Sequence, residues 1–302
     1  MSSVDPVAAH QAALRDLYRR HVGPGDRYAL VDFPDHANVG DSAIWLGETQ
    51  MLRAATGREP DYVATWDGFD MAAFRAASPE GVLFLHGGGN LGDIWPHHQL
   101  LREHVLAEVR DRSIVQLPQS IHFRATEGIA RFAALVDRHP DFHLYVRDRA
   151  SLALAQRHWT CSVDLAPDSA FALGRQVRAQ ADCDLLMLLR TDDERVDHSA
   201  ADIARQPDAL VLDWLDDGLL PLARPGETLA AHYDRLAAAR VDRGLALLSR
   251  GRRIVTDRLH AHILAVLLDI PHVALDNDYG KLSAYIAAWT ADSPLLLDRM
   301  TA

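Results

Sequence analysis

The chain has 302 residues, is 48% hydrophobic and carries a net charge of −11, values that suit a globular protein of about two domains. The negative charge excludes bulk attraction to nucleic acid or to an anionic membrane, so an anionic ligand would need a local cluster of cations. Two cysteines are too few for a disulfide framework. No apolar run reaches about 18 residues and the acidic N-terminal stretch does not resemble a signal peptide, so we expect a cytoplasmic protein.

The first half of the chain alternates between strand and helix patterns. Short apolar runs precede stretches of helical periodicity, and turn residues separate the two. This alternation predicts βαβ units and a parallel sheet. The predicted strands are 28–33, 62–65, 82–86, 113–117, 142–146 and 161–165, and the predicted helices are 8–21, 42–56, 69–77, 97–111, 126–138 and 150–158.

The alternation stops at residues 173–182, which we interpret as a linker, and then resumes. We therefore expect an α/β protein with two domains, residues 1–174 and 175–302, which face each other across a cleft. The last helix can pack back on the first domain. The second half is predicted to contain strands 185–189, 210–213, 254–255 and 271–275, a polar segment 191–207 with a short helix, and helices 227–250, 259–268 and 282–290, the first of them broken near Arg240.

Three glycines follow the predicted strand 82–86, and Asn90 follows the glycines. Gly87, Gly88 and Gly89 allow the backbone to approach a ligand closely and can direct N–H groups at an anion. The segment has neither the spacing of a dinucleotide-binding fingerprint nor the lysine of a phosphate loop. From these residues alone, a plain tight turn and a ligand cradle are equally consistent.

Charged residues also follow other predicted strands, at the edge where open α/β sheets bind ligands. Arg147 and Arg190 each end a strand and have a planar guanidinium suited to carboxylate or phosphate, although surface pairing with nearby acids is an alternative. Asp41 can cap the helix that follows it, or serve as an acid or base. Arg258 and His260 lie at the start of a strongly apolar helix.

Lys281 is the only lysine in the chain, although lysine and arginine together number 31. It follows the last predicted strand, where a compact point charge would suit an anion site. On composition alone, a solvated lysine at a helix start is the simpler explanation. His260 and His262 are two residues apart and do not share a helix face, and no metal-ligand spacing is present, so we expect no metal site.

Seven short motifs follow one another along the chain: residues 38–41, 85–90, 116–120, 146–151, 166–171, 256–261 and 279–281. Their order and spacing resemble those of the polysaccharide pyruvyl transferase family over most of the chain. The resemblance implies two Rossmann-like domains arranged as in glycosyltransferases of the B type. It also implies an enzyme that transfers the enolpyruvyl unit of phosphoenolpyruvate to two hydroxyls of a sugar, forming a cyclic ketal with loss of phosphate.

The resemblance further implies roles for individual residues. Arg147, His260 and Lys281 match the family's positions for phosphoenolpyruvate binding and catalysis, and Asp41 with Asn38 matches a motif that faces the acceptor sugar. The first domain would then bind the acceptor and the second phosphoenolpyruvate, which is a co-substrate, with no other cofactor. The further substrate contacts that we expect are Arg258, Arg190, Gly87, Gly88, Gly89 and Asn90.

The acceptor stays open at this point. Asp257 stands where the family often has serine, and the segment after Arg190 is short and acidic. Lipid-linked, nucleotide-linked and oligosaccharide acceptors all fit a role in exopolysaccharide or cell-surface glycan synthesis. A lipid-linked acceptor would bring the protein to a membrane surface. A homo-oligomer is compatible with the sequence. Two alternative functions remain, a nucleotide-sugar-dependent glycosyltransferase of the same fold and an inactive sugar-binding protein.

Overall fold

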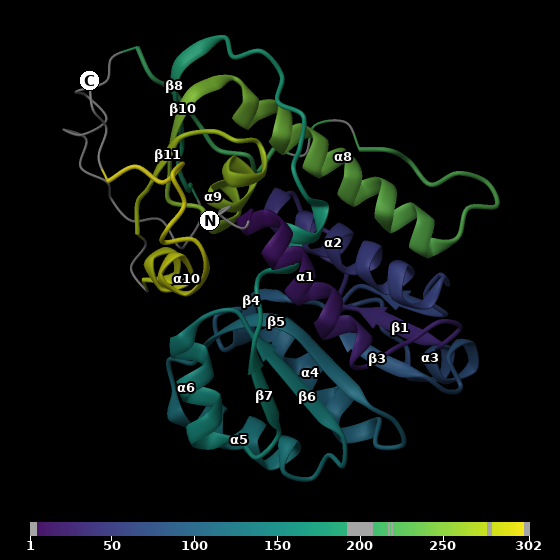
Figure 1. Cartoon of the computed structure of the whole chain (residues 1–302). Helices are drawn as coiled ribbons and strands as arrows, with labels where there is room; N and C mark the ends of the chain where they lie inside the picture. Colours follow the sequence, from purple (N-terminus) through teal and green to yellow (C-terminus); the bar gives the residue numbers. More distant parts are fainter. Residues whose placement is uncertain (1–4, 192–207, 217, 219, 277–279, 299–302) are drawn as a thin grey trace.

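Two parallel sheets, one of seven strands and one of four, organise the described part of the chain (Figure 1). The computed structural model describes residues 5–191, 208–216, 218, 220–276 and 280–298, and of Lys281 the backbone alone. All pairs between the named strands are parallel. The α/β class with parallel sheets is therefore confirmed.

The first half of the chain forms the larger sheet, in the order β2-β1-β3-β5-β6-β7 with β4 paired to β5 outside this path. Its strands are β1 (Tyr28–Val31), β2 (Tyr62–Ala64), β3 (Val82–Leu85), β4 (Gly88–Gly92), β5 (Ile114–His122), β6 (Phe142–Val146) and β7 (Ser162–Leu165). Its helices are α1 (Pro6–Arg19), α2 (Val39–Thr56), α3 (Met71–Ala77), α4 (Pro96–Glu108), α5 (Thr126–Val136) and α6 (Arg149–His158), followed by the short 3₁₀ helix η1 (Ser169–Leu173).

The second half forms the smaller sheet, in the order β11-β10-β8-β9. Its strands are β8 (Cys183–Leu188), β9 (Leu210–Leu212), β10 (Gly251–Thr256) and β11 (His272–Ala274), and its helices are α8 (Leu229–Ser249), α9 (Leu259–Leu267) and α10 (Lys281–Trp289). The polar segment predicted at residues 191–207 lies outside the described residues, except for Thr191. Residues 277–279 also lie outside them. Helix α10 packs against α6 of the first half and against α9 (Figure 1).

The structure departs from the sequence-based expectations about local structure at three places. Of the two alternatives for the glycines after β3, a plain tight turn does not hold, because Gly88–Gly92 form β4. Strand β5, expected to end at Leu117, continues through Pro118 to His122, and the β5–β6 register shifts around that proline, which has no N–H to donate. Helix α8 is unbroken at Arg240. That side chain is buried and donates to the carbonyl of Pro34 and the carboxylate of Asp35, so it fastens α8 to the loop before α2.

One hydrophobic core joins the two sheets, with α2 between them (Figure 1). Helix α2 contacts η1 and α1 on the larger sheet's side, and α8 and α9 on the smaller sheet's side. Trp45 of α2 is fully buried, and its Nε1 donates to Asp234 of α8 at 3.1 Å. Phe33, after β1, stacks on Tyr233 of α8 with ring centroids 4.0 Å apart. The two halves therefore do not have separate interiors on this side.

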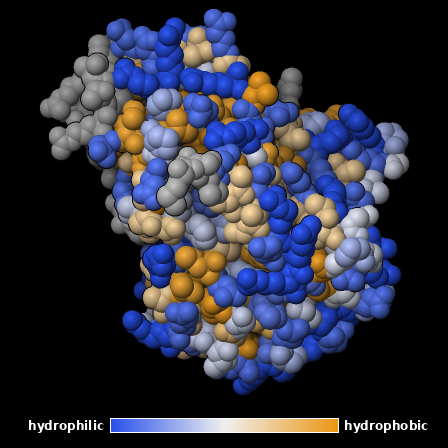
Figure 2. Space-filling view, in the orientation of Figure 1, coloured by the Kyte–Doolittle hydropathy of each residue, from blue (hydrophilic) through white to orange (hydrophobic). Residues whose placement is uncertain are grey.

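Two further hydrophobic clusters complete the interior, one on the other face of the larger sheet and one on the other face of the smaller sheet. The surface seen in Figure 2 is mostly hydrophilic, with scattered apolar side chains. Within the described residues, no helix combines the length and the hydropathy that spanning a bilayer would require.

The contact between α2 and η1 can be tested at Gly47, where a Cβ would lie 1.9 Å from the carbonyl oxygen of Ser169. We predict that Gly47→Ala lowers the free energy of unfolding by about 1–3 kcal/mol, because backbone segments must move apart and this outweighs the gain in helix propensity. Chemical denaturation measures the change. Gly23→Ala is the control, since its nearest atom is a side-chain oxygen of Asp26 at 3.8 Å, and equal stability of both variants would contradict the tight packing.

Candidate active site

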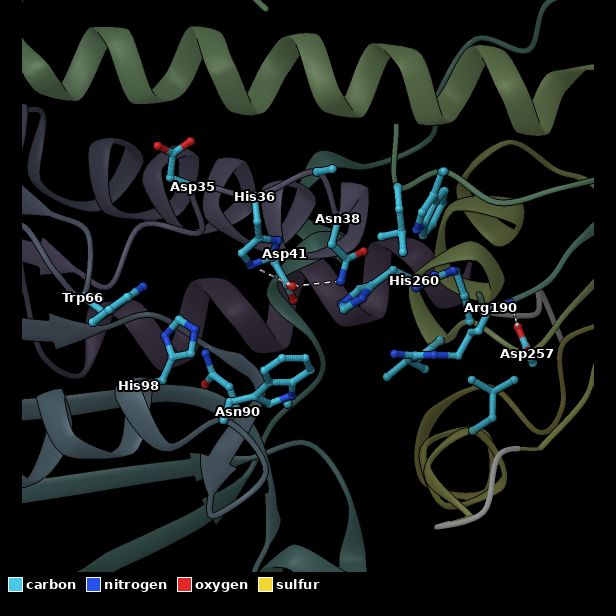
Figure 3. Close-up of a pocket in the computed structure, with 18 of the residues that line it drawn as sticks. Asp35, His36, Asn38, Asp41, Trp66, Asn90, His98, Arg190, Asp257 and His260 are labelled. Atoms are coloured by element: carbon cyan, nitrogen blue, oxygen red, sulfur yellow. Dashed lines mark hydrogen bonds and ion pairs between the residues drawn. The ribbon is translucent and has the colours of Figure 1, made fainter. Parts of the chain in front are cut away.

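A pocket of about 500 Å³ lies where strands of both sheets end. Its lining comes from segments that follow β1, β2, β3, β4 and β6 in the larger sheet, and β8, β9 and β10 in the smaller one. In Figure 3, Trp66, His98 and Asn90 lie on one side, Arg190 and Asp257 lie on the opposite side, and the motif residues of α2 and α9 lie between them. The volume is within the range of a small-molecule site.

Arg147, directly after β6, is the centre of a buried charge cluster in the pocket wall. Its side chain is 3% exposed, and its Nη1 donates to Oδ2 of Asp168 at 2.6 Å. Nε2 of His260 lies 3.3 Å from the same carboxylate oxygen and 3.5 Å from Nη1 of Arg147. Nε of Arg147 donates to Ser120 at 3.0 Å. The cluster thus joins residues from both sheets.

The cluster can carry His260 in two protonation states. Because arginine only donates, a neutral Nε2 of His260 accepts from Arg147, whereas a protonated Nε2 donates to Asp168. Burial opposes ionisation of Asp168, but His260 and Arg147 outweigh it and hold the pKa of the carboxyl well below its usual range. Asp168 is therefore ionised at neutral pH and stabilises a positive charge on His260.

The N-terminus of α2 brings the motif of residues 38–41 into the pocket (Figure 3). Asn38 is the N-cap: its Oδ1 accepts from the N–H of Gly40 at 3.2 Å, and its Nδ2 donates to Oδ2 of Asp41 at 2.9 Å. A Cβ at Gly40 would lie 2.1 Å from Nδ1 of His260. The motif therefore caps a helix, orients a carboxylate and leaves room for the histidine.

His36 lies beside Asp41, with its Nε2 3.6 Å from the carboxylate Oδ2 (Figure 3). Burial opposes ionisation of Asp41, but the attraction of His36 and His260 in their protonated forms, and of other neighbours such as Arg147, outweighs it and lowers the pKa of the carboxyl. Burial lowers the pKa of His36, in spite of the attraction of Asp41. At neutral pH the pair combines an ionised carboxylate with a neutral imidazole, an arrangement that can accept a proton.

A group of buried polar side chains, which we call the polar layer, hydrogen-bonds to the pocket residue Asn90 and to its neighbours. Oδ1 of Asn90 accepts from Nη2 of Arg102 and from Nε2 of Gln119, the latter at 2.8 Å. Nε of Arg102 donates to Gln116 at 2.7 Å, and its Nη2 donates to Asp32 at 3.4 Å. The amide of Asn90 is thus held in one orientation by side chains of α4 and β5.

Two histidine–carboxylate pairs belong to the same layer. Nδ1 of His98 lies 2.6 Å from Asp32, which is one of two described non-glycine residues with positive φ, at 77°. Nδ1 of His86 lies 2.6 Å from Glu48 of α2. Burial opposes a charge on His86, but the Glu48 carboxylate outweighs it and raises the pKa of the imidazole. Both pairs are buried and fix their side chains, and His98 also lines the pocket.

The smaller sheet contributes two arginines to the pocket. Arg258, the N-cap of α9, donates from Nε and Nη2 to the two carboxylate oxygens of Asp213, both at 2.7 Å. Much of its charge is therefore balanced within the protein. The N–H of Arg190 donates to Asp257 at 2.9 Å, which fixes the backbone where β8 ends. No side chain caps the N-terminus of α9, where the first N–H groups of a helix have no partner within the helix.

Most residues singled out from the sequence line this pocket, namely Asn38, Asp41, Gly89, Asn90, Arg147, Arg190, Arg258 and His260. Gly87 and Gly88 do not, and the N–H of Gly87 already donates to Glu48 at 2.8 Å. Lys281 opens α10, next to the pocket residue Leu282, and its side chain lies outside the described part.

Sequence reasoning missed the two carboxylates that partner the arginines, Asp168 and Asp213, and it missed His36. Asp168 lies in a motif that was recognised but given no role. The usable signal was that an arginine predicted at a buried strand end requires a counter-charge. Among the described residues, no group of three or more His, Cys, Asp or Glu side chains is arranged to hold a metal ion.

The buried pair predicts a pH-dependent loss of stability in Asp168→Asn. At pH 7 the variant should lose about 3–5 kcal/mol of unfolding free energy, because Arg147 keeps its charge without a partner. Since folding lowers the pKa of Asp168, the deficit should be full above the unfolded-state value of about 3.9 and shrink as pH falls below it. Denaturation at several pH values measures this, and Asp164→Asn, on an exposed pair with Arg20, is the control. A deficit unaltered at pH 3 would refute the interpretation.

Known proteins are similar to this chain in sequence and in fold. The family profile described as "Polysaccharide pyruvyl transferase" matches residues 38–279. The chain is 32% identical over 308 residues to "Pyruvyl transferase 1" of Schizosaccharomyces pombe, with 95% of this chain and 76% of that protein covered. It is 28% identical over 277 residues to "Putative pyruvyl transferase EpsO" of Bacillus subtilis, with 87% and 85% covered. A crystal structure of an uncharacterized Klebsiella pneumoniae protein has the same fold, with a TM-score of 0.62 at 18% identity over 99% of this chain and 100% of that one. The pocket thus lies in a chain that belongs to the polysaccharide pyruvyl transferase family.

Proposed function

We propose that this pyruvyl transferase moves the enolpyruvyl unit of phosphoenolpyruvate onto two hydroxyls of a sugar acceptor, as a cyclic ketal. The observation that carries the proposal is the Arg147–Asp168–His260 cluster in the wall of a pocket formed by both sheets. Asp168 balances the charge of Arg147, so the cluster has a net positive charge when His260 is protonated. A protonated His260 could therefore attract the anionic groups of phosphoenolpyruvate and give a proton to its methylene carbon.

Phosphoenolpyruvate carries a carboxylate and a phosphate, so its binding needs focused positive charge in a protein with a net charge of −11. Arg147 and Arg190 come to the pocket from opposite sheets. The start of α9, which has no side-chain cap, would add N–H donors and the positive end of the helix dipole for the phosphate. Lys281, at the start of α10, would complete the anion site, a role that rests on the sequence.

The transfer then proceeds by the following bond changes and proton transfers. The protonated His260 gives a proton to the methylene carbon, and the central carbon becomes electrophilic. The first sugar hydroxyl bonds to that carbon, the carbon–oxygen bond to phosphate breaks with its electron pair leaving on the phosphate, and the second hydroxyl closes the ketal. The two hydroxyls release two protons, one of which restores His260 while the other leaves with phosphate. Asp168 stabilises the charged imidazole through this cycle.

We place the acceptor hydroxyls near Asp41. The lowered pKa of Asp41 makes it a weak base, so the proton that it accepts would pass to the neutral His36, 3.6 Å away, and from there leave with the phosphate. Asn38 holds the carboxylate toward the pocket, and Asn90, fixed by the polar layer, would hydrogen-bond another hydroxyl. Asp41 and Asn38 are thus assigned to the acceptor, as the motif resemblance implies.

We further propose that residues 1–174 and 175–302 are two Rossmann-like domains arranged as in B-type glycosyltransferases, with acceptor and donor bound between them. Two parallel sheets with a pocket at their carboxyl ends support this arrangement. The product would be a pyruvylated glycan, in keeping with the family description.

Incubation with phosphoenolpyruvate and a panel of galactose, mannose and N-acetylhexosamine acceptors, free and nucleotide-linked, tests the reaction. We expect phosphate release together with a matching mass gain of one acceptor, and His260→Gln should lower kcat by about 100-fold or more, because it removes the proton transfer. His158→Gln, on the exposed end of α6, should retain full activity. Lack of turnover with every acceptor would refute the proposed function.

Lys281→Ala should weaken phosphoenolpyruvate binding by roughly 10- to 100-fold, the effect of losing one charged hydrogen bond. Titration calorimetry measures the affinity, and thermal melting without ligand should be almost unaltered. Arg157→Ala, which removes an exposed cation of α6 outside the pocket, controls for net charge. If both variants bind as tightly as the wild type, Lys281 has no place in the site.

A further inference from the structure

Two exposed tryptophans flank the pocket on the side of the larger sheet. Trp66, in the loop after β2, is 43% exposed, and Trp95, the N-cap of α4, is 37% exposed. The other four tryptophans of the chain are buried or half-buried. Exposing so large an apolar ring has no benefit for folding, so two such rings at one pocket indicate contact with a ligand.

A second hollow of about 230 Å³ adjoins the pocket, with which it shares the lining residues Trp66 and His97. Its lining is mostly aromatic or apolar and consists of Trp66, Phe69, His97, Leu100, Leu101 and His104. Trp66 and His97 line both spaces, and their rings stack with centroids 4.7 Å apart at 27°. The hollow is smaller than the ~300–1,000 Å³ of a complete ligand site, so it suits one part of a ligand whose remainder occupies the main pocket.

We infer that this hollow, which we call the Trp66 subsite, binds a second sugar residue of the acceptor. The inference rests on the proposed function and deepens it by assigning a place to the sugar residue next to the one that receives the ketal. The residue that receives the ketal lies at Asp41, and its neighbour in the glycan lies over Trp66 with the apolar C–H face of its ring on the indole.

The chemistry of the subsite favours a sugar over the tail of a lipid-linked acceptor. A sugar ring has a flat C–H face for Trp66 and hydroxyls at its edge, and His97 and His104 provide ring nitrogens able to pair with such hydroxyls. An acyl or prenyl tail would call for a longer, wholly aliphatic groove. Of the two leucines that line the subsite, Leu100 is 60% exposed and Leu101 is buried, so the subsite offers a lipid tail little aliphatic surface.

Binding of paired acceptors tests the inference without requiring turnover. Titration calorimetry would compare the methyl glycosides of galactose, mannose and N-acetylglucosamine with the corresponding disaccharides and tetrasaccharides. For at least one pair, we expect the disaccharide to bind the wild type about five- to tenfold more tightly than the methyl glycoside, the worth of one aromatic stacking contact. Trp66→Ala should abolish that ratio, and Trp66→Phe should restore most of it.

Leu222→Ala is the matched control, because Leu222 is 86% exposed and lines neither space. Its ratio should equal that of the wild type. A ratio unaltered in Trp66→Ala, absence of binding by every oligosaccharide, or an octyl glycoside that binds more tightly than the disaccharide would each overturn the subsite. Oligosaccharide binding that depends on Trp66 without phosphate release would overturn the proposed reaction alone.

Discussion

The ion pair between Arg147 and Asp168 is the interaction on which the rest of the site depends. Asp168 is fully buried, and besides Arg147 it accepts from the N–H of Ala170 at 2.9 Å, which caps η1. Its own N–H donates to the hydroxyl of Tyr285 on α10 at 3.2 Å, and Trp289 of α10 donates to the carbonyl of Arg147 at 2.9 Å. The side chains and the backbone groups of these two residues therefore connect β6, η1 and α10.

A buried ion pair is weak evidence of stability, because desolvation of both charges offsets most of their attraction. Its value here is positional. Since each charge would be costly to bury alone, the two side chains have one favourable arrangement, and that arrangement sets the position of His260. Gly40 on the other side of the imidazole leaves no spare space. The histidine is thus held between the two halves of the molecule with little freedom to rotate.

The sequence was a good guide to elements and a poorer guide to partners. Strand and helix periods are local, so most strands of both sheets followed from pattern, as did the positions of Arg147 and His260 at the ends of strands, whereas the roles of the two residues came from the family resemblance. Long-range pairing leaves no local signal. Nothing near Arg240 shows that Asp35 lies within 3.1 Å, so a buried cation was mistaken for a helix break. For the glycines after β3, the sequence left a tight turn and a ligand cradle open and did not indicate a strand, because their pairing with β5 depends on a strand far along the chain.

The position of α2 between the sheets has a mechanical consequence. In many enzymes built from two α/β units, a hinge lets one unit swing over the substrate, and part of the binding energy drives that closure. Here a swing would have to separate Phe33 from Tyr233 and withdraw Trp45 from Asp234, which would open fully packed interior to water. The shared core therefore opposes a hinge motion between the two sheets, so the pocket walls that come from both sheets are held in place relative to each other before a ligand binds.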